Sequence, residues 1–194
     1  MTPRFEDALA YAARAHRGQH RKGTTIPYLS HLLAACAIVL EDGGSEDEAI
    51  AALLHDAVED AGGKEQAAAI RQRFGDRVAR IVEECSDTDE DPKPPWLDRK
   101  RADVERAKTA ADDVRRVCLA DKIHNARSIV SDYRDLGEEL WPRFTTGNGD
   151  DQVWYFDSLV AAFRRPVDNR LVEELARIVE ELKALRAART ESRD

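Results

Sequence analysis

The chain has few aromatic residues and no long apolar segment. Phe, Trp and Tyr together make up 6% of its 194 residues, whereas Ala, Leu, Arg and Glu are prominent. This balance favours helices over sheet. No apolar run approaches the roughly 18 residues that a membrane-spanning helix needs. The N-terminus also lacks the basic and then apolar pattern of a signal peptide. These absences predict a soluble protein that is not exported.

Cysteine is also scarce, and its pattern excludes a disulfide framework. The three cysteines, Cys36, Cys85 and Cys118, are widely spaced in the sequence and odd in number. A disulfide scaffold uses paired spacings and an even number. The predicted role of each thiol is packing in the core. A cytoplasmic location follows from this cysteine usage.

Basic residues are outnumbered by acidic ones, which gives a formal net charge of −8. Non-specific binding of nucleic acid depends on the neutralisation of phosphates by basic side chains, so nucleic acid is not an expected partner. A membrane partner is not expected either. A small phosphorylated substrate remains compatible with this charge if a metal ion and a local basic patch offset the field. The sequence leaves the oligomeric state open.

Apolar residues recur at helical spacing along most of the chain, which predicts an all-α fold with roughly eight or more helices. Ser45 and Glu48 form a capping box that begins one of these helices. The acidic and proline-rich segment 86–95 is predicted to be an exposed loop. Because no internal repeat or long linker is present, we expect one domain over residues 1–189 and a charged, disordered tail at 190–194. The clearest predicted helices span residues 4–17, 29–40, 111–130, 153–163 and 169–189.

Four ionisable residues interrupt an apolar segment that is predicted to be a buried helix, residues 51–63. His55 with Glu59, and Asp56 with Asp60, are spaced by four residues, so on a helix each pair shares a face. Buried together, these groups would repel one another and lose hydration unless a cation is present. The alternative is a solvated helix end that stops at the following glycines. The apolar residues around the cluster favour a metal site.

Two other predicted helices supply further ligand candidates. His31 begins one apolar helix, and Asp121 lies inside another. Together with His55 and Asp56 they form a set of nitrogen and oxygen donors without a thiolate, which suits Mn, Fe, Ni, Zn or Mg. For Asp121 the alternative is a carboxylate that is paired with a neighbouring Lys or Arg. The predicted metal ligands are His31, His55, Asp56 and Asp121.

Neither Glu59 nor Asp60 is needed to complete four protein ligands. Each is therefore a candidate catalytic carboxylate that orients a water molecule or accepts its proton. The polar loop 18–27 contains Arg21 and Lys22. This loop is either a solvated connection or an anion site, and its position next to His31 favours the anion site. Metal-assisted hydrolysis of a phosphoester or pyrophosphate is the chemistry that these residues predict.

The motifs resemble those of a known family. The order His, His-Asp, Asp is the signature of the HD phosphohydrolase superfamily. HRGQHRKGTTIPYLSH (16–31), HDAVED (55–60) and LADKIHN (119–125) are similar to successive motifs in the hydrolase domain of RelA/SpoT homologues. WLDRKRADVERA and WYFDSL resemble the stand-alone members, the small alarmone hydrolases. The resemblance covers residues 8–163.

The resemblance implies an HD-domain helical bundle that uses Mn2+ to remove the 3′-pyrophosphate from guanosine tetra- and pentaphosphate. It also implies that Arg21 and Lys22 contact phosphate, that Asn125 contacts a ribose or phosphate oxygen, and that Tyr155 contacts the nucleoside. One departure is Trp96, which occupies a position where a relative has a basic residue.

Other functions remain open at this stage. Relatives accept adenosine alarmones or the 2′-phosphate of NADPH, and the choice of purine is not readable from the sequence. A nucleotidase of the wider HD group is the enzyme alternative, although that group lacks the motif at 16–31. A non-catalytic module that binds a metal or a nucleotide is the other alternative. Glu59 and Asp60 argue against it, because a binding module has no need of carboxylates beside a ligated metal.

Overall fold

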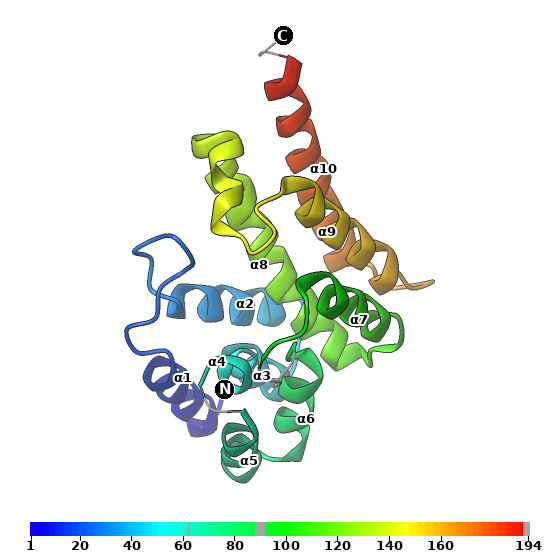
Figure 1. The fold of residues 1–194 in the computed structure, drawn as a ribbon. Helices are drawn as coiled ribbons and strands as arrows, with labels where there is room; N and C mark the ends of the chain where they lie inside the picture. The colour runs from blue at the N-terminus through cyan, green and yellow to red at the C-terminus, as the bar shows by residue number, and fades with distance from the viewer. Residues whose placement is uncertain (62, 88–91, 192–194) are drawn as a thin grey trace. The chain divides into compact units, whose positions relative to one another are not determined.

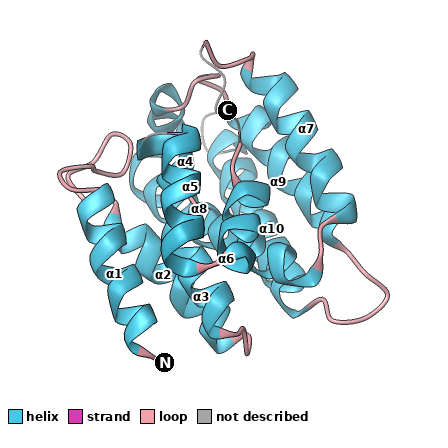
Figure 2. Cartoon of the chain, turned by 90° about the horizontal axis from the view of Figure 1, so that it is seen from below, coloured by secondary structure: helices cyan, strands magenta, loops and turns pink. Residues whose placement is uncertain are grey.

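The chain is helical throughout the residues that its structure, a computed structural model, describes: 1–61, 63–87 and 92–191. Within these ranges there is no strand, and the only β pairing is an isolated bridge between His20 and Pro27 (Figure 2). The prediction of an all-α fold is therefore confirmed. None of the described helices has the length and apolar content to cross a bilayer.

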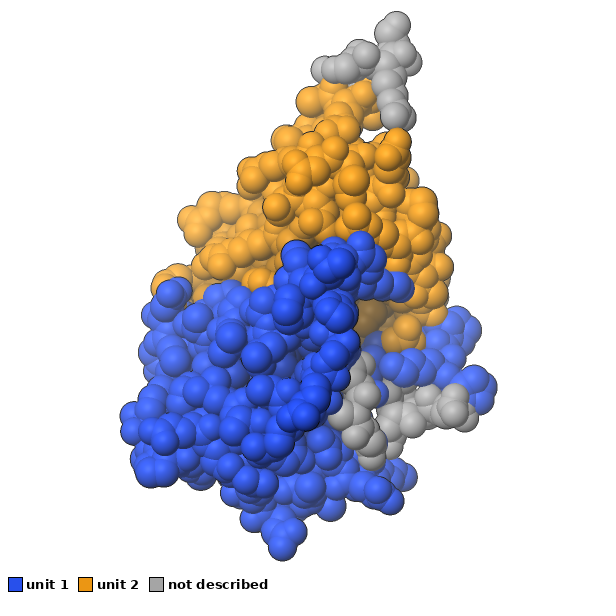
Figure 3. Space-filling view, turned by 90° about the vertical axis from the view of Figure 1, so that its left-hand side faces the viewer, with its two compact units in different colours: residues 1–95, 111–121 blue, residues 96–110, 122–194 orange. Residues whose placement is uncertain are grey.

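The chain divides into two compact units (Figure 3). Unit 1 contains residues 1–95 and 111–121, and unit 2 contains residues 96–110 and 122–194. The single domain expected over residues 1–189 stays a prediction. The last helix continues to Glu191, and the rest of the predicted tail lies outside the described residues.

Unit 1 is built around the short helix α3 (Glu46–Leu54), which packs against α1, α2 and α6 (Figure 1). Every residue from Ala49 to Leu54 has no exposed surface, because neighbouring helices cover α3 on all sides. The predicted capping box is present, since the Ser45 hydroxyl accepts from the backbone N–H of Glu48. The other helices of unit 1 are α1 (Pro3–Ala15), α2 (Leu29–Glu41), α4 (Ala57–Ala61), α5 (Gly63–Phe74), α6 (Asp76–Cys85) and the first part of α8 (Asp112–Leu136).

The segment predicted as one helix over residues 51–63 is interrupted. Helix α3 ends at Leu54, and α4 begins at Ala57 after a turn formed by His55 and Asp56. The expectation of a continuous helix is wrong at this point. The apolar residues continue on both sides of the turn, with Ala57 and Val58 buried, so the hydrophobic pattern gives no sign of the break.

Unit 2 is centred on α9 (Gly149–Phe163), which packs against α7 (Trp96–Thr109) and α10 (Arg170–Glu191). Helix α9 begins earlier than predicted because the side chain of Asn148 accepts a hydrogen bond of 2.7 Å from the backbone N–H of Asp150. The remainder of α8 and a 3-10 helix, η1 (Gly137–Arg143), complete this unit. Helix α8 therefore carries Asp121 in unit 1 and Lys122 in unit 2.

Candidate metal centre

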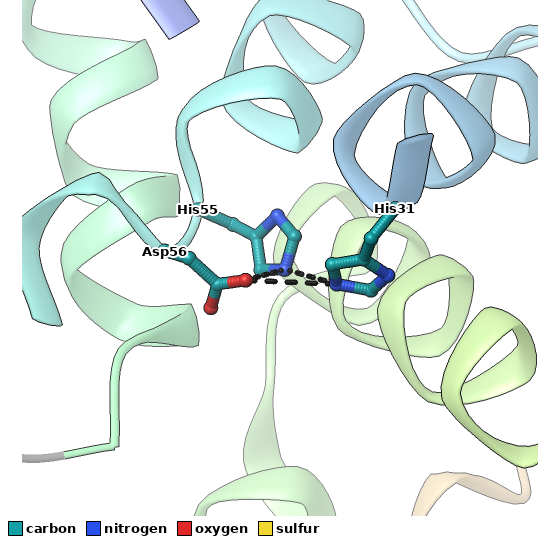
Figure 4. Close-up of side chains that lie close together, drawn as sticks. All are labelled: His31, His55 and Asp56. Carbon is teal, nitrogen blue, oxygen red and sulfur yellow. Dashed lines mark hydrogen bonds and ion pairs between the residues drawn. The ribbon is translucent and has the colours of Figure 1, made fainter. Parts of the chain in front are cut away.

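Three of the predicted ligands converge in unit 1 (Figure 4). His31 comes from the first turn of α2, and His55 and Asp56 come from the turn between α3 and α4. The Nε2 atom of His31 lies 3.3 Å from Nε2 of His55 and 3.5 Å from Oδ2 of Asp56. The Nε2 atom of His55 lies 3.0 Å from the same Oδ2. These donor atoms therefore face one common point.

Asp121 brings a fourth donor atom to the same place. Its Oδ1 atom lies 3.2 Å from Nε2 of His31 and 3.5 Å from Nε2 of His55. Both histidines are fully enclosed, whereas the side chains of Asp56 and Asp121 retain 19% and 10% of their exposure. The structure thus brings all four predicted ligands together and leaves solvent access on the carboxylate side.

The spacing of the four donors fits a divalent metal ion. If an ion sits about 2.1 Å from each donor, neighbouring ligands of a tetrahedral or octahedral shell lie about 3.0–3.4 Å apart. The observed separations of 3.0–3.5 Å match this range. Two imidazoles and two carboxylates without a thiolate are also the donors that borderline and hard divalent ions accept. His31, His55 and Asp56 therefore form a group that could hold such an ion, and Asp121 adds a donor near both histidines.

Hydrogen bonds behind the donors orient two of them. The Nδ1 atom of His55 lies 2.8 Å from the carbonyl oxygen of Ala52, which can only accept, so Nδ1 carries the proton. In the neutral ring, which is the form that binds a metal, Nε2 then carries a lone pair directed at the cluster. The hydroxyl of Tyr28 donates to Oδ2 of Asp56 at 2.6 Å. Outer partners of this kind fix the orientation of metal ligands.

The electrostatics of the cluster favour positive charge beside its carboxylates. Burial of His55 favours its neutral form, but the nearby carboxylates of Asp56 and Asp121 outweigh it and hold its pKa well above the ordinary value of 6.5. Burial also favours a neutral Asp56, yet the neighbouring imidazoles hold its pKa well below 3.8. A proton on His55 thus balances the carboxylates when no metal is bound, and a metal ion would replace it.

The basic loop that precedes α2 lies next to this cluster. The guanidinium carbon of Arg21 is 5.7 Å from the ring centre of Tyr28, whose hydroxyl reaches Asp56. Lys22 is exposed on the same loop, which the backbone bond from Arg21 N–H to the Ile26 carbonyl closes at 2.8 Å. The structure therefore places both predicted phosphate contacts on the loop that leads into the ligand helix.

The two catalytic candidates are only partly described. Glu59 lies on α4, and its Oε1 atom accepts from Nζ of Lys93 at 2.7 Å. Glu59 also lines a surface hollow together with Lys64 and Glu83. The backbone of Asp60 belongs to α4, but its side chain lies outside the described residues. The argument that both share a helical face with His55 and Asp56 assumed one continuous helix, which the turn interrupts, so their role beside the metal stays a prediction.

Unit 2 contains the other two predicted substrate contacts. Tyr155 is buried on α9, and its hydroxyl donates to Oδ2 of Asp103 on α7. The Nζ atoms of Lys100 and Lys122 lie 5.2 Å and 5.9 Å from the centre of the Tyr155 ring. Asn125 is half-buried on α8.

Asp103 is a partly buried carboxylate, with 14% of its side chain exposed, that the sequence analysis did not select. Burial alone would raise its pKa, but Lys122, Lys100, the Tyr155 hydroxyl and Arg106 together hold it below 3.8. Trp96 lies beside this group, with its ring centre 6.1 Å from that of Tyr155.

Two positioning residues, Tyr28 and Asp103, were missed by the sequence analysis. Tyr28 had a signal, since it lies in the PY pair three residues before His31. Asp103 had none, because it sits among the charges of a polar helix and becomes distinctive only when Tyr155 packs against it.

Comparison with known proteins identifies the family. A family model described as HD domain matches residues 8–141. The chain belongs to the HD domain family. Human MESH1, named guanosine-3′,5′-bis(diphosphate) 3′-pyrophosphohydrolase, is 39% identical over 128 residues, which cover 63% of this chain and 68% of the relative. The frog (Xenopus tropicalis) protein of the same name is 38% identical over 126 residues, with the same two coverages.

A longer curated protein and two solved structures are also similar to this chain. The bifunctional (p)ppGpp synthase/hydrolase SpoT of Escherichia coli K12 is 34% identical over 134 residues, which cover 66% of this chain but 18% of that protein. A solved structure described as a metazoan ortholog of SpoT that hydrolyses ppGpp matches with a TM-score of 0.77 and 27% identity, over 94% of this chain and 97% of its own. A Listeria monocytogenes structure matches with a TM-score of 0.69 and 29% identity, over 78% of this chain and 97% of its own.

Proposed function

We propose that this protein is a metal-dependent hydrolase that removes the 3′-pyrophosphate from guanosine 3′,5′-bis(diphosphate) and related alarmones. The convergence of His31, His55, Asp56 and Asp121 at 3.0–3.5 Å carries the proposal, because it supplies the metal site that this reaction needs. The identity of the proposed substrate comes from the names of the relatives. Adenosine alarmones and NADPH are the substrates to compare with it.

The resident ion is proposed to be Mn2+, held by His31, His55, Asp56 and Asp121. Hard carboxylate oxygens together with imidazole nitrogens are compatible with Mn2+. The ion supplies positive charge for the phosphate oxygens and makes water a better nucleophile at neutral pH. Both histidines are buried, so the close packing around them restrains their rings.

Glu59 and Asp60 are proposed to handle the proton of the attacking water. Hydrolysis requires that the water lose a proton as its oxygen bonds to phosphorus, and that the departing ribose 3′ oxygen gain one. A carboxylate can accept the first proton and return it. The ion pair with Lys93 restrains the Glu59 side chain on the exposed side of α4.

Arg21 and Lys22 are proposed to bind phosphate, because they carry positive charge on the loop that leads into α2. Asn125 and Tyr155 are proposed to contact the nucleoside portion of the substrate. The Tyr155 hydroxyl is already engaged by Asp103, so we expect the ring, rather than the hydroxyl, to provide the contact.

A product assay tests the proposed activity. The purified protein would be loaded with Mn2+, and then mixed in turn with ppGpp, its adenosine counterpart, NADPH and 5′-nucleotides. Ion-exchange chromatography would identify the products. We expect pyrophosphate and guanosine 5′-diphosphate from ppGpp, with slower reaction of the 5′-nucleotides. Release of only orthophosphate, or a preference for NADPH or 5′-nucleotides, would contradict the proposed substrate.

His55→Ala and Asp121→Ala test the metal site independently of the substrate. Each variant removes one donor, so we expect both metal content and turnover to be lost. Asp98→Asn, an exposed change on α7, is the matched control and should keep both. Full metal content in either ligand variant would show that the ligand set is wrong.

A further inference from the structure

Two of the three cysteines, which are widely separated in the sequence, meet in unit 1. Cys85 is the last residue of α6, and Cys118 lies on α8. Their Sγ atoms are 2.7 Å apart, and the thiol of Cys85 also lies 3.8 Å from the Val114 carbonyl oxygen. Sequence spacing could not reveal this pair, because packing of α6 and α8 creates it. The expected role of simple core packing does not account for two sulfur atoms in direct contact.

The third cysteine provides an internal reference. Cys36 is buried on α2, and burial raises the pKa of its thiol to about 11. Its thiolate is therefore scarce at neutral pH, and reagents in solution have little access to it. Cys85 and Cys118 are both partly exposed. Since thiolate character and access govern reactivity, the pair should react before Cys36 does.

We propose that Cys85 and Cys118 form a reversible disulfide that ties the end of α6 to α8. The oxidant is a low-molecular-weight disulfide. One thiol loses its proton and its sulfur attacks the reagent, which releases one molecule of reduced thiol. The second thiol then loses its proton and displaces the other half of the reagent. The protein gives up two electrons and two protons, and the reagent becomes two thiols. The folded chain already places both sulfur atoms for this second step.

The disulfide would act on the segment of α8 that leads to the metal cluster. Cys118 precedes Asp121 by three residues, so the two lie about one turn apart on the same helix. A bond to Cys85 closes a covalent loop between residues that are 33 positions apart. Closing such a loop restricts the unfolded chain and stabilises the folded one. In the oxidised protein, the segment that carries the Asp121 carboxylate should therefore open less often. The ion bound there should dissociate more slowly.

The first test determines whether the disulfide between Cys85 and Cys118 forms. The protein would be incubated with oxidised glutathione, and its thiols counted before and after denaturation, with peptide mapping by mass spectrometry. We expect the count to fall from three to one, the mass of the joined peptides to fall by two hydrogens, and Cys36 to stay reduced. Dithiothreitol should restore all three thiols. Three remaining thiols, reaction of Cys36, or a dimer linked between chains would overturn the proposal.

The second test measures the effect on stability and on the metal. We expect the melting temperature of the oxidised form to rise by roughly 5–10 °C. We also expect the ion to pass to a chelator several-fold more slowly than in the reduced form. Cys85→Ser and Cys118→Ser should abolish both differences, and Cys36→Ala should keep them. An oxidised protein that releases metal as fast as the reduced one would refute the link to Asp121. Neither measurement involves a nucleotide, so the results do not depend on whether the proposed hydrolase activity is correct.

Discussion

Tyr28 occupies the most connected position around the metal cluster. Its hydroxyl donates to Asp56, its ring meets His31 edge to face at 5.5 Å between ring centres, and its other side stacks on His16 at 5.2 Å. Arg21 lies over the same ring. One side chain thus connects a ligand carboxylate, a ligand helix and the basic loop, which makes it a positioning residue.

Replacement of Tyr28 by Phe should weaken metal binding while the fold is preserved. The ring contacts remain, but Asp56 loses the donor that orients its Oδ2 atom. Loss of an outer-shell partner typically costs about 10–100-fold in metal affinity. Titration with Mn2+ followed by calorimetry measures the change, and Tyr11→Phe, on α1, is the control. An unchanged affinity in Tyr28→Phe would show that the hydrogen bond does not position Asp56.

Replacement of Glu59 by Gln should lower turnover while the metal stays bound. The amide cannot accept a proton, and removal of a positioned general base typically costs roughly 100- to 10,000-fold in rate. The kcat for ppGpp and the metal content would be measured together, with Asp60→Asn alongside. Glu65→Gln, an exposed change on α5, is the control.

A further variant separates chemistry from positioning at Glu59. Lys93→Met removes the ion-pair partner but leaves the carboxylate intact. If Lys93→Met is as slow as Glu59→Gln, the ion pair rather than proton transfer explains the effect. Unchanged turnover in both Glu59→Gln and Asp60→Asn would remove these carboxylates from the mechanism.

At the scale of elements, the turn between α3 and α4 shapes the metal site. His55 and Asp56 are adjacent in the sequence, yet their donor atoms lie 3.0 Å apart. On a continuous helix, successive side chains diverge by about 100° and do not face each other. The turn that follows α3 is therefore the place where the two donor atoms come together.

The sequence predicted the helices better than it predicted the turns and caps between them. Apolar periodicity marked α2 and α8 well, because burial sets their inner faces. It could not reveal the turn at His55 and Asp56, since the flanking residues are apolar and buried on both sides. The early start of α9 likewise depends on one hydrogen bond from Asn148, which periodicity does not record.

Replacement of Ser45 by Ala should destabilise α3 and hence unit 1. The hydroxyl accepts from Glu48 N–H, and loss of such a cap typically costs about 1 kcal/mol. Urea denaturation would measure the free energy of unfolding. Ser131→Ala, at an exposed position within α8, is the control and should be neutral or slightly stabilising. Equal stability of wild type and Ser45→Ala would show that the cap contributes nothing.

At the scale of the whole molecule, unit 2 has a partly buried charge whose contribution to stability depends on pH. Burial disfavours the ionised form of Asp103. Favourable interactions with Lys122, Lys100, Tyr155 and Arg106 stabilise that form, so the pKa in the folded protein lies below 3.8. A carboxylate with a lowered pKa stabilises the fold above its unfolded pKa. That stabilisation disappears as the pH falls through the folded value.

Replacement of Asp103 by Asn should therefore cost stability at neutral pH but little in strong acid. The loss at pH 7 should be on the order of 1–3 kcal/mol, as for other hydrogen bonds to buried charged groups. It should remain constant down to about pH 4 and then shrink toward pH 2. Denaturant titrations across this range measure it, with the exposed Asp98→Asn as control. A difference that stays constant down to pH 2 would contradict the assignment.

Removal of the metal should lower the melting temperature of the whole chain. An ion present at about 100 times its dissociation constant stabilises the folded state by about 2.7 kcal/mol. For a protein of this size, this corresponds to roughly 5–10 °C. Calorimetry with Mn2+ and then with excess EDTA measures the shift, and His31→Ala should show none. An equal response of His31→Ala would place the stabilising ion elsewhere.

The four donors come from three segments that are distant along the chain: the start of α2, the turn after α3 and the middle of α8. The complete cluster cannot form until all three segments have packed, which is late in folding. An ion that binds only this finished arrangement slows unfolding and leaves the rate of folding almost unchanged. The lifetime of the protein against proteases that attack its opened state would then follow the metal supply around it.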